Sequence, residues 1–317
     1  MSAKINHTSP NRWVWKWVLF FALFSFASAW AETSLTIPSQ YGEIIHQWDQ
    51  KSPNQLFIIG IGHRDTLTRA NGNNTSRVQA EVYKIGEWLI RHQEVGLLLP
   101  EGFFKNPATK DDPLAMKAPK NGTSCADPVD LPAIEERLAD SSTFVNAEML
   151  LKANHPLRTV QVEDLTLYME VRDGLLKLVN DRNPWCDTPL LVSELDYLQE
   201  RRTATMLQNI PGIIDQEFRQ GTIRHKKAIF TIGIAHLRDI IKYIDEQKIA
   251  IHPPPSAPGD RADYQAELRL PKDKFGVSII IPRTLAQDQR ILEINRLDKI
   301  VKESRRQTAL RASPPLN

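Results

Sequence analysis

Short apolar runs alternate along the chain with longer stretches in which apolar residues recur at helical spacing. Five segments are typical of strands: 56–60 (LFIIG), 95–100 (VGLLLP), 158–164 (RTVQVED), 227–233 (KAIFTIG) and 276–282 (GVSIIIP). Five others predict helices: 77–92, 134–153, 165–179, 190–210 and 237–247. Strands that alternate with helices indicate an α/β fold, in which helices flank a mostly parallel central sheet.

Two polar, proline-rich stretches interrupt this alternation, and we expect them to be long inserted loops. They cover residues 105–132 and 253–274. A length of 317 residues allows one large domain or two small ones, and we expect a single domain over residues 32–300. The remaining residues, 301–317, are expected to form a basic polar tail in solvent.

The N-terminus has the three parts of a secretory signal. Three basic residues and no acidic residue precede an apolar run: Lys4, Arg12 and Lys16. The run, 17–26 (WVLFFALFSF), is shorter than the ~20 residues that a membrane-spanning helix needs. Ala29 and Ala31 satisfy the small-residue rule for cleavage before Glu32. We therefore expect a periplasmic or secreted protein without a stable membrane anchor; the alternative is that residues 1–31 are retained as a signal anchor.

Loss of the signal changes the charge of the chain. The full chain has 40 basic and 38 acidic residues, and the signal carries three of the basic ones, which leaves 37 and a net charge near −1. A near-neutral surface lacks the basic patch that nucleic-acid binding requires. We therefore expect no nucleic-acid partner.

Cys125 and Cys186 are the two cysteines of the chain, and both lie in proline-containing loop sequence. An even pair in an oxidising compartment suggests a disulfide, and the alternative is two unpaired thiols. Closing a loop of about 60 residues would stabilise the fold by roughly 4 kcal/mol in the chain-entropy view.

Polar residues stand at the ends of four of the expected strands. They are His63, Glu101, Glu163 with its neighbour Asp164, and His236. The two histidines end similar sequences, GIGH and GIAH, in which small residues let the backbone turn sharply. Because parallel strands end at one edge of a sheet, we expect these side chains to converge. Two imidazoles with carboxylates suit a divalent transition metal, or equally a general acid–base set without metal.

Four motifs in this order resemble those of the TraB/Tiki family: GIGH at 60–63, LLPEGFF at 98–104, RRTATMLQNI at 201–210 and FTIGIAHLRDII at 230–241. That family is marked by two G-x-x-H motifs, a glutamate after the second strand, and an arginine on a helix before the second G-x-x-H. The resemblance implies a metal-dependent hydrolase, most directly a peptidase. Related folds occur in erythromycin esterase and in haem-binding ChaN-like proteins.

The resemblance carries over to this chain residue by residue. His63 and His236 match the motif histidines, and Glu101 matches the motif glutamate. Glu163 matches less closely, and its alternative role is to cap the helix that follows it. The resemblance implies that these four residues bind a divalent ion such as Mn, Co or Zn. It also implies that the first three are catalytic, together with an arginine.

The motif arginine is Arg202, which lies four residues before Met206, as the family's spacing requires. We expect Arg202 to stabilise a developing oxyanion, and the neighbouring Arg201 to be a solvated helix charge. The chain departs from the family pattern in its loops at 105–132 and 253–274, and in lacking the transmembrane segments that many relatives carry. Neither departure specifies a substrate.

These observations predict an exported metal-dependent hydrolase that acts on a peptide or small-molecule substrate. Two alternatives use the same residues. One is an ester hydrolase of the erythromycin-esterase type. The other is a non-catalytic ChaN-like protein that binds haem or another small ligand. The sequence contains no H-E-x-x-H, G-x-S-x-G or Walker motif that would point to another enzyme class.

Overall fold

The computed structural model describes residues 35–62, 74–102, 130–140, 145–180, 188–254 and 262–312. The chain divides into two units, residues 1–36 and 37–317, and every element described belongs to the second. The expected signal peptide, His63, Cys125 and Cys186 lie outside the described residues, as does most of the loop expected at 105–132. Within the described part of the chain, no helix is long and apolar enough to span a bilayer.

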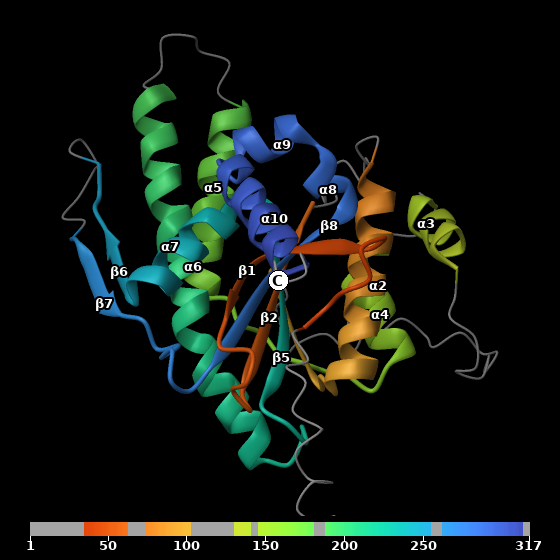
Figure 1. Cartoon of the computed structure of the whole chain (residues 1–317). Helices are drawn as coiled ribbons and strands as arrows, with labels where there is room; N and C mark the ends of the chain where they lie inside the picture. The colour runs from red at the N-terminus through yellow and green to blue at the C-terminus, as the bar shows by residue number, and fades with distance from the viewer. Residues whose placement is uncertain are drawn as a thin grey trace, which may run out of the picture. The chain divides into compact units, whose positions relative to one another are not determined.

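Six strands form the central sheet (Figure 1). In order across the sheet they are β1 (Gly42–Trp48), β8 (Gly276–Pro282), β2 (Gln55–Ile61), β5 (Lys227–Gly233), β3 (Leu97–Pro100) and β4 (Arg158–Thr159). All neighbours pair in parallel except β1, which runs antiparallel to β8. The α/β fold with a mostly parallel sheet that the sequence predicts is therefore confirmed.

The inner strands are buried on both faces, and this explains their sequences. Every residue of β2 and β8 is buried, and so is all of β5 except its first residue. A strand covered on both faces needs apolar side chains at nearly every position, so it shows a continuous apolar run instead of alternation. The strands expected at 56–60, 227–233 and 276–282 are confirmed for this reason.

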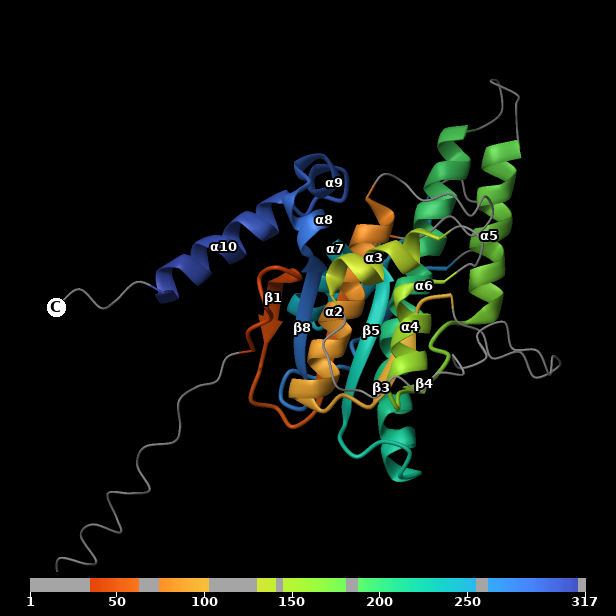
Figure 2. The same ribbon diagram turned by 90° about the vertical axis from the view of Figure 1, so that its right-hand side faces the viewer.

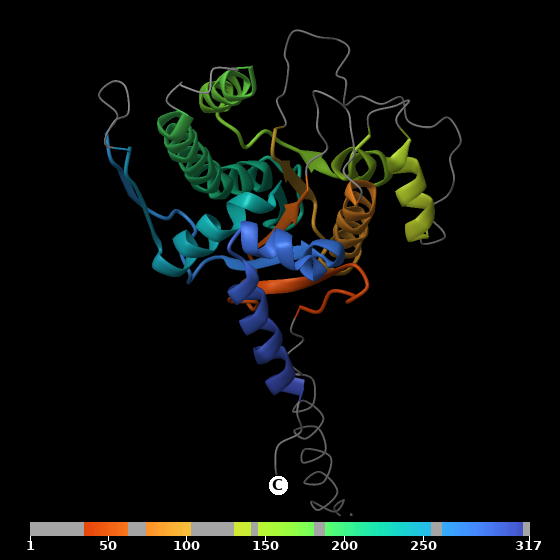
Figure 3. The same cartoon turned by 90° about the horizontal axis from the view of Figure 1, so that it is seen from above.

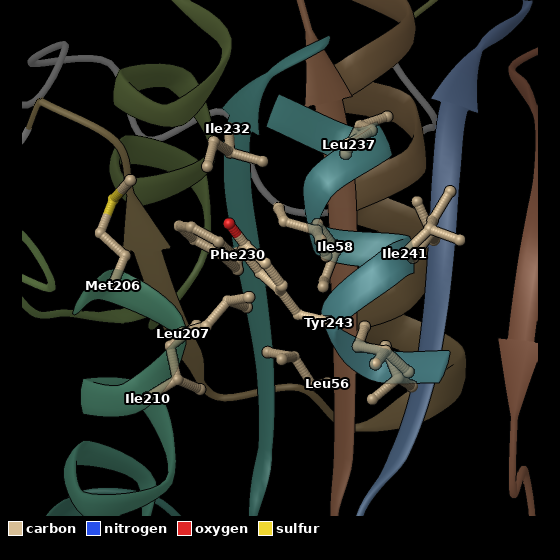
Figure 4. Packing of buried hydrophobic residues seen from close by; sticks show 14 of the residues in the cluster. Leu56, Ile58, Met206, Leu207, Ile210, Phe230, Ile232, Leu237, Ile241 and Tyr243 are labelled. Carbon is tan, nitrogen blue, oxygen red and sulfur yellow. The ribbon is translucent and has the colours of Figure 1, made fainter. Parts of the chain in front are cut away.

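Helices cover both faces of the sheet (Figure 1), and the view from above separates the two layers (Figure 3). One layer contains α2 (Thr75–Gln93), with α3 (Leu131–Ala139) and α4 (Ala147–Asn154) packed against it. The other contains α6 (Thr188–Arg219), α7 (Leu237–Glu246) and α5 (Leu165–Asn180), which packs against α6. In the main core, side chains of α6 and α7 such as Leu207 and Ile241 meet Ile58 and Phe230 of the sheet (Figure 4).

The chain leaves the neighbouring strands β2 and β5 toward opposite faces of the sheet. After β2 it continues to α2, and after β5 it continues to α7 in the other layer. In parallel α/β sheets, ligands bind at such a reversal, outside the carboxyl ends of the two strands. Both G-x-x-H sequences belong to these two strand ends.

Two expected elements are shorter than the sequence predicts. The prediction of one helix at 134–153 is wrong, because the segment contains the separate helices α3 and α4. Asn146 starts the second helix by accepting a 2.9 Å hydrogen bond from Met149 N. The strand expected at 158–164 is confirmed only over β4, which pairs with β3 at the edge of the sheet.

The polar segment expected as a loop at 253–274 contains a strand, so that prediction is wrong for part of it. Strand β7 (Tyr264–Glu267) pairs antiparallel with β6 (Lys248–Ile251) in a separate two-stranded sheet. Its residues alternate between half-buried and exposed. A short, partly exposed strand of this kind keeps a polar composition, and its sequence therefore resembles a loop.

The segment expected as a basic polar tail at 301–317 is helical over residues 301–312. Strand β8 is followed by α8 (Arg283–Gln287), α9 (Gln289–Ile294) and α10 (Asp298–Ala312). Ser304 Oγ donates to Ile44 O at 2.8 Å, and Arg305 makes two hydrogen bonds of 2.9 Å to Glu43. These contacts hold the first part of α10 against β1, whereas residues 306–310 are exposed (Figure 2).

Candidate functional site

Three side chains that follow strands meet one arginine at the carboxyl edge of the sheet. Glu101 follows β3, Glu163 follows β4, and His236 ends a short 3₁₀ turn (η1, Ile234–His236) after β5. Arg202 reaches them from the middle of α6. Each of the four side chains is at most 9% exposed. We call these four residues the carboxylate–arginine–histidine cluster.

The Glu101 carboxylate lies at the centre of this cluster. Its Oε1 is 2.8 Å from Arg202 Nη2 and 3.5 Å from His236 Nε2. Its Oε2 accepts a 2.6 Å hydrogen bond from the backbone N–H of Gly233, at the end of β5. The N–H of Glu101 in turn donates to Thr231 O at 2.9 Å, which extends the pairing of β3 with β5. The sheet itself therefore fixes the position of Glu101.

Arg202 binds both carboxylates. Its Nε donates to Glu163 Oε2 at 2.8 Å and its Nη2 donates to Glu163 Oε1, so this pair is bidentate. Nη2 also contacts Glu101, Nη1 donates to Gln199 Oε1 at 3.2 Å, and the Tyr168 ring lies 5.4 Å away. Burial lowers the pKa of Arg202, but hydrogen bonds and charge from the two carboxylates outweigh it and raise the pKa above its usual value. The arginine is therefore charged.

Glu163 is turned toward Arg202 and the end of β3. Its Oε1 also accepts a 2.9 Å hydrogen bond from the N–H of Gly102. Gly102 has a φ of 74°, in the left-handed region that favours glycine. Three hydrogen bonds therefore hold the Glu163 carboxylate, two of them from Arg202 and one from Gly102.

A chain of hydrogen bonds holds the other side of the His236 ring. Nδ1 lies 2.6 Å from Thr203 Oγ1, and this hydroxyl donates to Gln199 O at 2.8 Å. Gln199 therefore supports the cluster twice, through its side chain to Arg202 and through its carbonyl to Thr203. His236 itself is 8% exposed, so its ring is held inside the protein.

The two G-x-x-H strand ends approach each other closely. A Cβ at Gly60 would lie 2.5 Å from Leu237 Cδ1, which is too close for any larger residue without movement. Gly60 therefore makes room for the residue that follows His236. The first motif histidine, His63, lies outside the described residues, so its approach to the cluster stays a prediction.

Of the two adjacent arginines on α6, Arg202 belongs to the cluster, whereas Arg201 makes its contacts elsewhere. The Arg201 guanidinium lies 4.7 Å from the Tyr264 ring centroid on β7, and its Nη1 donates to Tyr197 Oη at 2.8 Å. The expectation that Arg201 is a solvated helix charge is wrong, because the side chain packs between aromatic rings. Its contacts join α6 to the β6–β7 sheet.

Sequence reasoning missed four residues that support the cluster: Gly102, Tyr168, Gln199 and Thr203. The signal that could have found two of them is helical spacing. Gln199 lies three residues before Arg202 and four before Thr203, so the three side chains share one face of α6.

Glu101 and His236 have the spacing of two ligands on one metal ion. Their nearest atoms are 3.5 Å apart, and two ligands bound at about 2.1 Å in tetrahedral geometry lie roughly 3.4 Å apart. Among the described residues, no group of three His, Cys, Asp or Glu side chains could hold a metal ion. A complete site would need a ligand from beyond them, and His63 is the candidate that the sequence supplies.

No protein-family profile matches the sequence, and no curated protein or solved structure is similar enough to count as a match. The function of the chain must therefore be inferred from the cluster and its surroundings.

Proposed function

We propose that this protein is a metal-dependent hydrolase that cleaves peptide bonds, as its resemblance to the TraB/Tiki family implies. The observation that carries the proposal is the 3.5 Å separation of Glu101 Oε1 and His236 Nε2. A carboxylate oxygen and an imidazole nitrogen at this distance match part of a transition-metal site. They also lie where parallel α/β sheets place their ligands, at the carboxyl ends of the strands.

The side chains of the cluster also suit a cation. Among the described residues, the cluster combines the two carboxylates of Glu101 and Glu163 with the single guanidinium of Arg202. Carboxylate oxygens and an imidazole nitrogen are ligands that a divalent transition metal accepts. A divalent ion there would supply Lewis acidity and lower the pKa of a bound water.

In this proposal Arg202 acts chiefly by orienting Glu101. It directs four of its five N–H groups at Glu163, Glu101 and Gln199. One N–H at Nη1 is left for a reacting oxygen, so any stabilisation of an oxyanion by Arg202 uses that single group. Glu163 in turn holds Arg202, and this makes it a supporting residue.

Metal content and peptide cleavage by the mature chain, residues 32–317, test the proposal. The purified protein should contain about one transition-metal ion per chain by elemental analysis, and a chelator should abolish its cleavage of a peptide library. Three variants should lose both metal and cleavage: His63→Ala, Glu101→Gln and His236→Ala. The matched control is His252→Ala, an exposed histidine paired with Asp263 outside the cluster, and it should keep both.

Peptide cleavage by metal-free protein would contradict the metal-dependent mechanism. Cleavage of esters but not peptides would instead support the esterase alternative. An inactive protein that gives a Soret band when haemin is added would support the ChaN-like alternative. In that case the His236→Ala variant shows whether haem binds at the same residues.

A further inference from the structure

Thr203 stands between the His236 ring and the backbone of α6. It is fully buried, and its Oγ1 lies 2.6 Å from His236 Nδ1 and 2.8 Å from Gln199 O. A threonine inside a helix commonly donates its hydroxyl proton to the carbonyl four residues earlier, and Gln199 is that residue. The hydroxyl therefore has two close partners.

A threonine hydroxyl has one proton to donate, and this limits how both contacts can be made. If the proton goes to Gln199 O, Thr203 Oγ1 can accept the Nδ1–H of His236, and both contacts are hydrogen bonds. If the proton goes to His236 Nδ1, the Thr203 and Gln199 oxygens face each other at 2.8 Å with no proton between them. That second arrangement is repulsive in a buried site, so the first is favoured.

We propose that Thr203 is a positioning residue that fixes the His236 imidazole in the tautomer protonated at Nδ1. The lone pair then lies on Nε2, which faces Glu101 Oε1 at 3.5 Å. Neither of these atoms has a proton to offer the other, so the gap between them suits a cation. Histidines that bind metals commonly donate their other ring N–H to a protein acceptor, which fixes tautomer and ring orientation.

The tautomer depends only on the hydrogen bonds, whereas its importance for metal binding rests on the proposed function. The two parts can therefore be measured separately. Thr203→Val removes the hydroxyl with little change of shape, and Thr203→Ser keeps it. Thr205→Val is the matched control, since Thr205 Oγ1 also donates to the carbonyl four residues earlier, Arg201 O at 2.8 Å, without a contact to His236.

Nitrogen NMR of the metal-free mature protein, labelled with ¹⁵N-histidine, reports the tautomer directly. At a pH where the ring is neutral, we expect His236, assigned by its absence in His236→Ala, to show a protonated Nδ1 and an unprotonated Nε2. Thr203→Ser and Thr205→Val should give the same pattern. Thr203→Val should shift the proton toward Nε2.

A wild-type ring protonated at Nε2 would overturn the proposal, and so would an unchanged tautomer in Thr203→Val. If Thr203→Val does not fold, the wild-type and Thr203→Ser spectra still decide, because both must show the proton on Nδ1.

Zn²⁺ affinity, measured by competition with a chromogenic chelator, tests the link to function. We expect Thr203→Val to bind Zn²⁺ about 10–100-fold more weakly than Thr205→Val.

If no variant binds Zn²⁺ and the wild-type tautomer is as expected, the proposed function fails and the assignment of Thr203 stands. If Zn²⁺ binds equally well to Thr203→Val and Thr205→Val, the positioning role fails although the metal site stands.

Discussion

A buried arginine that pairs with two buried carboxylates stabilises a fold only while all three groups are present. In the cluster, Arg202 pairs with both Glu101 and Glu163, and the backbone N–H groups of Gly102 and Gly233 are further donors to them. Burying three charged groups has a desolvation cost larger than the free energy that a surface ion pair contributes. Removing one member of the set leaves a buried charge without that counter-ion. At the scale of the residue, we therefore expect even conservative substitutions in the cluster to lower the free energy of unfolding.

Arg202→Leu should lower the free energy of unfolding by about 3–5 kcal/mol, because it leaves two carboxylates buried without their counter-ion. Urea denaturation followed by circular dichroism measures the change. The control is Arg201→Leu, which removes a stacking contact with Tyr264 and should cost about 1 kcal/mol. Equal losses in the two variants would show that the Arg202 contacts do not stabilise the fold.

The sequence predicts the cluster only in part, and the reason is geometric. Glu101 and His236 could be found because each follows an apolar run that forms an inner parallel strand. Thr203 and Gln199 could not, because their roles depend on which face of α6 meets the end of β5. That packing is set by residues far apart in sequence, and no local pattern reports it.

At the scale of the element, strands buried on both faces were predictable and exposed ones were not. Strand β1 lies at the edge of the sheet, and most of its residues are half-buried. Its sequence, GEIIHQW, mixes apolar and polar residues without clear alternation, and the strand was missed. The β6–β7 pair was also missed, because each strand is only four residues long and β7 is half-buried or exposed throughout, although Ile249 and Ile251 of β6 are buried in the core.

The junction of α2 and α4 gives the fold a pH dependence. His155, at the end of α4, has a nearly buried side chain beside Glu87 of α2. Burial lowers its pKa, and the nearby Glu87 only partly opposes this. The unfolded chain therefore binds a proton at His155 more readily than the folded chain, so stability falls as the pH drops below the ordinary histidine pKa of about 6.5.

His155→Gln should flatten this part of the stability profile. We expect the wild-type urea midpoint to decrease between roughly pH 7.5 and pH 5.5, and to decrease less in the variant, because glutamine takes up no proton. His252→Ala serves as the control, since that side chain is 64% exposed, and it should leave the slope unchanged. A variant with the full wild-type slope would place the proton uptake elsewhere.

At the scale of the whole molecule, the C-terminal helix α10 covers the edge of the sheet formed by β1. Strand β1 is an edge strand, and edge strands offer unpaired backbone groups to other chains. Helix α10 packs on it, with Val301 buried, Ser304 bonded to Ile44 O and Arg305 paired with Glu43. The last helix that the structure describes thus covers the first strand that it describes.

A chain that ends at residue 297 should therefore be less stable and more prone to self-association. Loss of the Val301 contact and of the hydrogen bonds to β1 should lower the free energy of unfolding by roughly 2–4 kcal/mol. Size-exclusion chromatography with light scattering should detect larger species. A chain that ends at residue 312 is the control, and a monomeric, equally stable protein ending at 297 would refute the role of α10.

The contact between Gly60 and Leu237 has an evolutionary consequence. Gly60 begins the first G-x-x-H motif and Leu237 directly follows the second, and a side chain at residue 60 would meet Leu237. A larger residue at position 60 would require the fully buried Leu237 side chain, next to His236 in the chain, to shift. A substitution at one of these two positions therefore changes which residues the other position tolerates, although the two lie far apart in the chain.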